Sequence, residues 1–283
     1  MIISLLACLD PEIIERLEKA GVEVLFFRHW IHRTHRKLII IDNKKSLIGG
    51  VNIVHHAKKW KDLLLEISGP IARKLEKTFS RTYHLAGGSK KLTSSKRKKG
   101  RQYKIRSWII EHTPIAGHKK LKQYYLKKIQ GAKHSLFFVT PYFIPRKWLE
   151  EALQEAAKRG VEINIIIPKN GDLRLLNIIN LYYVNRISKY GIKTYLSPHM
   201  NHAKAILIDE KEAMIGSGNL DSQSFEFNNE IGIFSREKAI VKKLSEILYH
   251  WKDEAELYKE QTMQIHWLYK VLGVIWKLLN PIL

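Results

Sequence analysis

The sequence is short of cysteine, of acidic residues and of long apolar runs. Its single cysteine, Cys8, excludes an internal disulfide framework, so a metal site would have to use histidine and carboxylate ligands. No uncharged apolar stretch reaches the roughly 18 residues that a membrane-spanning helix needs. Residues 1–9 are apolar but lack a basic beginning, which argues against a signal peptide. If the protein works at a membrane, we expect it to lie on the surface.

The shortage of acids leaves a strongly basic chain. Lysine and arginine number 49 against 27 aspartate and glutamate residues, which gives a net charge of +22 over 283 residues. Apolar residues make up 45%, enough for a packed core, so a wholly disordered chain is excluded. A surface this basic favours polyanionic partners, and both nucleic acid and anionic lipid fit that description.

Alternating strand and helix signals predict an α/β fold. Helices are expected at 10–20, 70–83, 146–159 and 173–190, and strands at 22–27, 38–41, 46–48, 63–67, 136–139, 161–167, 192–196, 205–208 and 213–215. The chain divides into a first lobe (1–88), a loop with nine basic residues and no acid (89–106), a second lobe (107–262) and an amphipathic helix (263–283). The loop is either a linker or a phosphate-binding patch. The last helix either docks on the protein core or lies on a membrane.

One segment occurs twice, 167 positions apart. His35, Lys37 and Asp42 recur in the same spacing and in a similar apolar context. For a given histidine, four further matches have a chance on the order of 10⁻⁵ at ordinary residue frequencies. The spacing therefore indicates a duplicated unit. The paired positions are His35 with His202, Lys37 with Lys204, Asp42 with Asp209, Gly49 with Gly216, and Asn52 with Asn219.

The duplicated residues suit a displacement at phosphorus. If the two lobes pack about a pseudo-twofold axis, two histidines, two lysines and two asparagines converge on one site. One neutral imidazole can act as nucleophile while the other, protonated, acts as acid, since the ordinary histidine pKa lies near about 6.5. The lysines and asparagines can hold the phosphate oxygens, so neither a metal nor a cofactor is required.

Two further acids can orient the imidazoles. Asp62 lies 27 residues after His35, and Glu230 lies 28 residues after His202. We expect each acid to accept a hydrogen bond from the histidine of its own lobe and so to fix its tautomer.

Other polar residues of the motif have plainer interpretations. Asp42 and Asp209 complete the site candidates, and we expect them to cap the turn after the strand rather than to react. His32 and His199 stand three residues before the paired histidines, a spacing that places the two histidines of each pair on opposite faces of a strand and suits zinc poorly.

The two H-x-K-x4-D segments resemble the signature of the phospholipase D superfamily. Several neighbouring segments are similar to bacterial cardiolipin synthases, namely 49–52 (GGVN), 60–62 (WKD), 67–70 (ISGP), 140–145 (TPYFIP), 216–221 (GSGNLD), 224–225 (SF) and 228–230 (NNE). The resemblance implies a two-lobed pseudo-twofold repeat with mixed sheets flanked by helices. It also implies that His35 forms a phosphohistidine and that His202 protonates the leaving alcohol, although these two roles could be exchanged.

The resemblance implies phosphatidyl transfer between phosphatidylglycerol molecules, at the cytoplasmic side of a bacterial cytoplasmic membrane. One alternative is a hydrolase acting on phospholipid or nucleic acid, and the positive net charge of the chain would favour binding of nucleic acid. Another is a protein that binds anionic lipid or nucleic acid without turnover. Lobe 1 has only 34 residues before His35, so we expect it to be shortened. A shortened sheet has an open edge, and a second copy of the chain is one way to cover it.

Overall fold

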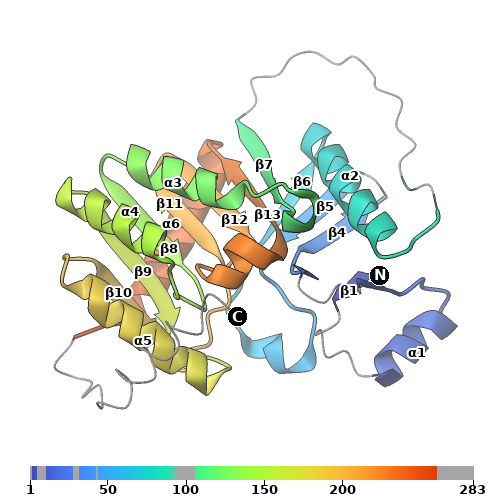
Figure 1. Cartoon of the computed structure of the whole chain (residues 1–283), viewed down its shortest axis with the longest axis horizontal. Coiled ribbons are helices and arrows are strands. Elements are labelled where there is room, and N and C mark those ends of the chain that lie inside the picture. Colours follow the sequence, from blue (N-terminus) through green and yellow to red (C-terminus); the bar gives the residue numbers. More distant parts are fainter. Residues whose placement is uncertain are drawn as a thin grey trace.

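The computed structural model describes residues 2–4, 11–27, 32–42, 44–90, 92 and 106–259. It is an α/β fold with helices against mixed sheets, as the sequence predicts (Figure 1). The helices are α1 (Pro11–Lys19), α2 (Pro70–Leu85), α3 (Leu121–Gly131), α4 (Lys147–Lys158), α5 (Arg174–Ser188) and α6 (Lys238–Asp253), with short turns η1 (His55–Lys59), η2 (Pro114–Ala116) and η3 (Gln223–Phe227). The strands are β1 (Ile2–Ser4), β2 (Leu25–Phe27), β3 (Arg33–Thr34), β4 (Lys37–Ile41), β5 (Lys45–Gly49), β6 (Leu64–Ser68), β7 (Ser107–His112), β8 (Ser135–Val139), β9 (Glu162–Pro168), β10 (Lys193–Ser197), β11 (Ala205–Ile208), β12 (Glu212–Gly216), β13 (Asn228–Ser235) and β14 (Glu256–Leu257).

Lobe 2 is built on the largest sheet. Its strands follow the order β14-β10-β9-β8-β11-β12-β13, and β7 pairs with β13. The neighbours β8, β9 and β10 are parallel, with α4 and α5 as the connections between them. The strands β8 and β9 are mainly buried apolar residues because both of their faces are covered. Residues of α3, α4 and α5 bury one face and residues of α6 bury the other.

The described part of lobe 1 has smaller sheets than lobe 2. Its main sheet has the antiparallel order β4-β5-β6, while β1 and β2 form a separate parallel pair. In lobe 2, β8 joins β11 to β9. Among the described residues of lobe 1, no strand takes the place of β8, so β4 ends its sheet. A second subunit at that edge stays a prediction.

The duplicated unit has the same strand order in both lobes. The strands β4, β5 and β6 correspond to β11, β12 and β13, and α2 corresponds to α6. Both repeated glycines allow the second and third strands of each unit to come very close. A Cβ on Gly49 would lie 1.9 Å from the carbonyl oxygen of Leu63, and one on Gly216 would lie 2.7 Å from that of Ile231. Glycine therefore recurs for a steric reason.

The lobes exchange short parallel pairings at their junction. β3, from lobe 1, runs beside the first two residues of β13, with Thr34 opposite Asn229. Lys61 forms the matching parallel bridge with Asn201 of lobe 2. The backbone N–H of His35 donates to the Asn229 carbonyl at 3.0 Å, and that of His202 donates to the Lys61 carbonyl at 2.7 Å. The two bridges are equivalent under the repeat, so the junction has the pseudo-twofold symmetry that the sequence predicts.

Two predicted segments lie outside the described residues, namely the C-terminal helix at 263–283 and most of the basic loop, of which only Ser89, Lys90, Leu92 and Arg106 are described. Within the part that is described, none of the helices combines the length and the apolar character needed to cross a bilayer.

Candidate active site

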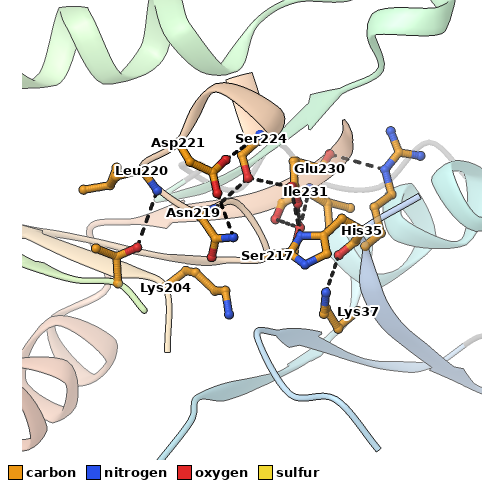
Figure 2. Close-up of polar contacts among 12 residues, drawn as sticks. His35, Lys37, Lys204, Ser217, Asn219, Leu220, Asp221, Ser224, Glu230 and Ile231 are labelled. Atoms are coloured by element: carbon orange, nitrogen blue, oxygen red, sulfur yellow. Dashed lines mark hydrogen bonds and ion pairs between the residues drawn. The ribbon is translucent and has the colours of Figure 1, made fainter. Parts of the chain in front are cut away.

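His35 lies in the extended stretch between β3 and β4 and points toward lobe 2. Its Nδ1–H donates to Oε1 of Glu230 at 2.9 Å (Figure 2). The Glu230 side chain is fully buried, while that of His35 keeps 27% of its surface exposed. With Nδ1 engaged by a carboxylate, Nε2 carries the free lone pair.

His202 occupies the equivalent position before β11. Its Nδ1–H donates to Oδ2 of Asp62 at 2.8 Å, and both side chains are nearly buried, at 5% and 9% exposed. The prediction that each acid serves the histidine of its own lobe was therefore wrong. The parallel bridges cause the exchange, because Asp62 directly follows Lys61, and Glu230 directly follows Asn229. Each lobe orients the imidazole of the other.

Glu230 has more support than Asp62. The Ser217 hydroxyl donates to its Oε2 and the Ser224 hydroxyl to its Oε1, the latter at 2.9 Å (Figure 2). Burial alone would raise the pKa of Glu230, but His35, Lys37 and the Ser217 hydroxyl outweigh burial and lower the pKa to about 2. The carboxylate is therefore ionised at neutral pH and fixes the His35 tautomer firmly.

The two lysines bring positive charge to the same place. Lys37 Nζ donates to the His35 carbonyl at 3.0 Å, and Lys204 Nζ lies 2.9 Å from each ring nitrogen of His202. Burial lowers the pKa of Lys37 to about 8. Burial, followed by repulsion from Lys37, lowers the pKa of Lys204 as well. Each amine lies beside a histidine of the motif, and in the ammonium form the two would attract an anion to the site.

Both imidazoles are harder to protonate than in water. Burial lowers the pKa of His202 to about 4, and the lysines reinforce the shift against the opposing effect of Asp62. Burial also lowers the pKa of His35; the carboxylate of Glu230 opposes this shift and the positive charge of Lys37 adds to it. Both shifts favour the neutral imidazole in the free site, and one neutral and one charged histidine stays a prediction for the site with phosphate bound. An anionic phosphate bound between the lysines would raise both pKa values.

The paired asparagines differ. Asn219 is buried, and its Nδ2 donates to Asp221 at 3.2 Å, beside the Ser224 N–H that donates to the same carboxylate at 2.8 Å. Asn52 is half-buried, and the structure records no hydrogen bond from it to any described residue. Burial raises the pKa of Asp221, which faces the charged groups of the site.

Asp42 and Asp209 do not reach the reacting groups. Each stands five residues beyond its lysine, about 16 Å along an extended strand, and each has a φ of 51°. The Asp209 carboxylate accepts the backbone N–H groups of Lys133, His134 and Ser135, at 2.7–3.1 Å, and so fastens the turn to the start of β8. Asp42 is exposed. We therefore assign them structural positions, as the cap interpretation expects.

Two contacts were missed from the sequence. The buried Arg36 guanidinium donates to the carbonyl of Glu230 at 3.3 Å, to Thr82 at 2.9 Å and to the carbonyl of His112 at 3.0 Å, which ties the motif of lobe 1 to lobe 2. Its counterpart in the repeat is alanine, and that asymmetry was the available signal. Trp60 also contacts the site, with its ring centroid 5.1 Å from that of His202.

The remaining histidines of the motif make separate contacts. His32 Nδ1 lies 2.9 Å from the carbonyl of Phe227, and His199 is exposed. The described ranges contain no group of three histidine, cysteine or acidic side chains placed to hold a metal ion.

Comparisons with known proteins place this geometry in a family. The family model "Cardiolipin synthase, PLD-like domain" matches residues 5–83 and 125–251. A cardiolipin synthase of Halalkalibacterium halodurans is 30% identical, over 97% of this chain and 59% of the relative. Cardiolipin synthase A of Buchnera aphidicola subsp. Schizaphis graminum is also 30% identical, over 96% and 59%. The chain thus spans about three fifths of the length of these relatives.

The fold matches a solved structure over nearly its whole length. A phosphatidylserine synthase of Haemophilus influenzae superimposes with a TM-score of 0.70 over 95% of this chain and 77% of that protein, at 13% identity. At this identity, the match establishes the two-lobed fold.

Proposed function

Because the chain belongs to the family of PLD-like cardiolipin synthases, we propose that it transfers a phosphatidyl group from one phosphatidylglycerol molecule to another. The observation that carries the proposal is the crossed pair of histidine–carboxylate contacts beside two lysines, of which Lys204 is buried and Lys37 is half-buried. This arrangement offers one nucleophile, one acid and two cations to a single phosphodiester.

In the first half-reaction, Nε2 of His35 attacks phosphorus and the bond to glycerol breaks. His35 suits this role because its ring is more exposed than that of His202 and because Glu230 stabilises the charge that develops on it. His202, which gains a proton as the bound phosphate raises its pKa, donates that proton to the departing glycerol oxygen. The products are free glycerol and a phosphatidyl group on His35.

In the second half-reaction, a hydroxyl of another phosphatidylglycerol attacks the phosphohistidine. His202 accepts the hydroxyl proton, the phosphorus–nitrogen bond breaks, and cardiolipin leaves. Lys37 and Lys204 would hold the phosphate oxygens in both steps, with Asn52 and Asn219 beside them. The step needs no metal or cofactor, since the lysines supply the positive charge.

The test is product analysis with purified protein and phosphatidylglycerol vesicles in the presence of EDTA. We expect cardiolipin and glycerol in equal amounts, and loss of both with His35→Ala or His202→Ala. Phosphatidic acid in place of cardiolipin would show a hydrolase. Absence of any lipid product would end the proposal.

A phosphodiesterase acting on nucleic acid is the second candidate, favoured by the net charge of +22. A nuclease assay in EDTA separates it from phosphatidyl transfer. We place the protein at the cytoplasmic side of a bacterial cytoplasmic membrane, because its proposed substrate is an anionic lipid of a bilayer.

A further inference from the structure

Two exposed segments carry large apolar side chains next to the site. In the first, Ile53 is 79% exposed and lies two residues before the start of the short helix η1. In the second, Leu173 and Leu175 are 52% and 49% exposed at the start of α5. Figure 1 shows η1 and α5 on the same, lower side of the view. We call Ile53, Lys58, Lys59, Leu173, Arg174 and Leu175 the rim surface.

The first segment is in contact with a catalytic ring. The rings of His56 and Trp60 meet edge to face with centroids 5.3 Å apart, and Trp60 lies 5.1 Å from His202. A molecule bound to the exposed side of η1 would therefore be separated from His202 only by the rings of His56 and Trp60.

The second segment is tied to the other side of the site. Asp172, the neighbour of Leu173, accepts the Tyr142 hydroxyl at 2.7 Å. The chain after Tyr142 pairs with the chain before Asp221, through the bridge between Phe143 and Leu220. Both parts of the rim surface are thus fixed to the site by defined contacts.

The rim surface carries three cations, with the carboxylate of Asp172 engaged by the Tyr142 hydroxyl beside them. Across the described ranges, no carboxylate forms an ion pair with Lys58, Lys59 or Arg174. Cations beside exposed aliphatic side chains match the boundary of an anionic bilayer, where headgroups meet the cations and the acyl region receives the apolar groups. A nucleic acid would use the cations but would gain nothing from Ile53, Leu173 and Leu175.

We propose that the rim surface docks on a bilayer containing anionic phospholipid, with Ile53, Leu173 and Leu175 entering the headgroup boundary. Docking in this orientation brings the lysines of the site to the level of the lipid phosphates. This inference rests on the proposed function for its choice of a lipid partner.

The test is co-sedimentation of the full chain with vesicles of phosphatidylglycerol and phosphatidylcholine in equal amounts, and with phosphatidylcholine alone. We expect the triple variant Ile53→Ser, Leu173→Ser, Leu175→Ser to lower the partition coefficient at least tenfold on the mixed vesicles. The pair Lys58→Glu, Lys59→Glu should lower it to a similar degree on mixed vesicles and much less on phosphatidylcholine.

Matched controls carry the same chemical changes elsewhere. Tyr190→Ser removes an exposed apolar side chain beyond the far end of α5, about 22 Å from its start. Lys242→Glu with Lys243→Glu reverses the same charge on α6. Both controls should bind vesicles within twofold of wild type. Equal losses for rim and control variants, unchanged binding of the triple variant, or binding of duplex DNA but not vesicles would each overturn the inference.

The experiment can refute the docking surface and the proposed function independently of each other. The partition measurement needs no reaction, so it is repeated in a His35→Ala background. If no cardiolipin forms but the rim variants still lose vesicle binding, only the proposed function fails. If cardiolipin forms and the rim variants bind as wild type, only the docking surface fails.

Discussion

Replacing Glu230 by glutamine would remove the charge that holds His35 while leaving the shape of the side chain unchanged. The structure gives the His35–Glu230 contact as a 2.9 Å bond inside a fully buried environment. Loss of such a charge-assisted bond costs about 1.5–3 kcal/mol, which corresponds to roughly a 10- to 150-fold slower reaction. A shift to the wrong tautomer would extend the loss toward about 10⁴-fold.

The informative assay uses a phosphatidyl ester of nitrophenol, whose leaving group departs without a proton. The nucleophile is still needed with this substrate, but the acid is not. In single-turnover trapping of the phosphohistidine, Glu230→Gln should therefore remain slow. Asp62→Asn, which disturbs His202, should be slow with phosphatidylglycerol and close to wild type with the nitrophenyl ester.

The opposite pattern would refute the reasoning. If the nitrophenyl ester rescues Glu230→Gln and not Asp62→Asn, either His202 is the nucleophile or each acid acts within its own lobe. His35→Ala and His202→Ala in the same assay decide between these two outcomes, since only the nucleophile is indispensable for trapping.

Three further outcomes follow from the described contacts. Burial lowers the pKa of Lys37 to about 8, and the ammonium form is the one that binds phosphate. The value of kcat/KM should therefore fall as pH rises through about 8, and Lys37→Arg should move this decrease to higher pH. Gly50→Ala should lower Tm and abolish turnover, because the added Cβ would lie 2.4 Å from the Asp62 carboxylate. The control Gly131→Ala adds a Cβ with no atom within 4 Å, so turnover should be unchanged and Tm unchanged or raised. Asp209→Ala should lower the free energy of unfolding by about 1–3 kcal/mol more than Asp42→Ala in denaturant titrations. Both residues have the same left-handed φ, but among the described residues backbone N–H groups donate to Asp209 and none donates to Asp42, so equal effects would contradict that role.

The duplicated motif allowed the site to be predicted because it depends on spacing alone. The structure places His35 beside Glu230 of lobe 2 and His202 beside Asp62 of lobe 1, so the two motifs lie at one junction between the lobes, as the repeat predicts.

The pairing of acids could not be predicted, because distance along the chain favours the histidine of the same lobe. Only the parallel bridges at Asn229 and Lys61 reverse it, and a two-residue ladder leaves no recognisable pattern in the sequence. The direction of the histidine pKa shifts could not be predicted for a related reason. Burial and the neighbouring lysines set it, and both arise from tertiary packing.

The exchange of carboxylates makes each half of this chain chemically unfinished. A single copy of the unit would hold a histidine without its proper acid and an acid without its histidine, and it would be completed only by another copy in the reciprocal orientation. If either half lost its carboxylate, the histidine of the other half would lose its hydrogen-bond partner. A substitution of the acid in one half therefore acts on the other half, even where the two sequences differ.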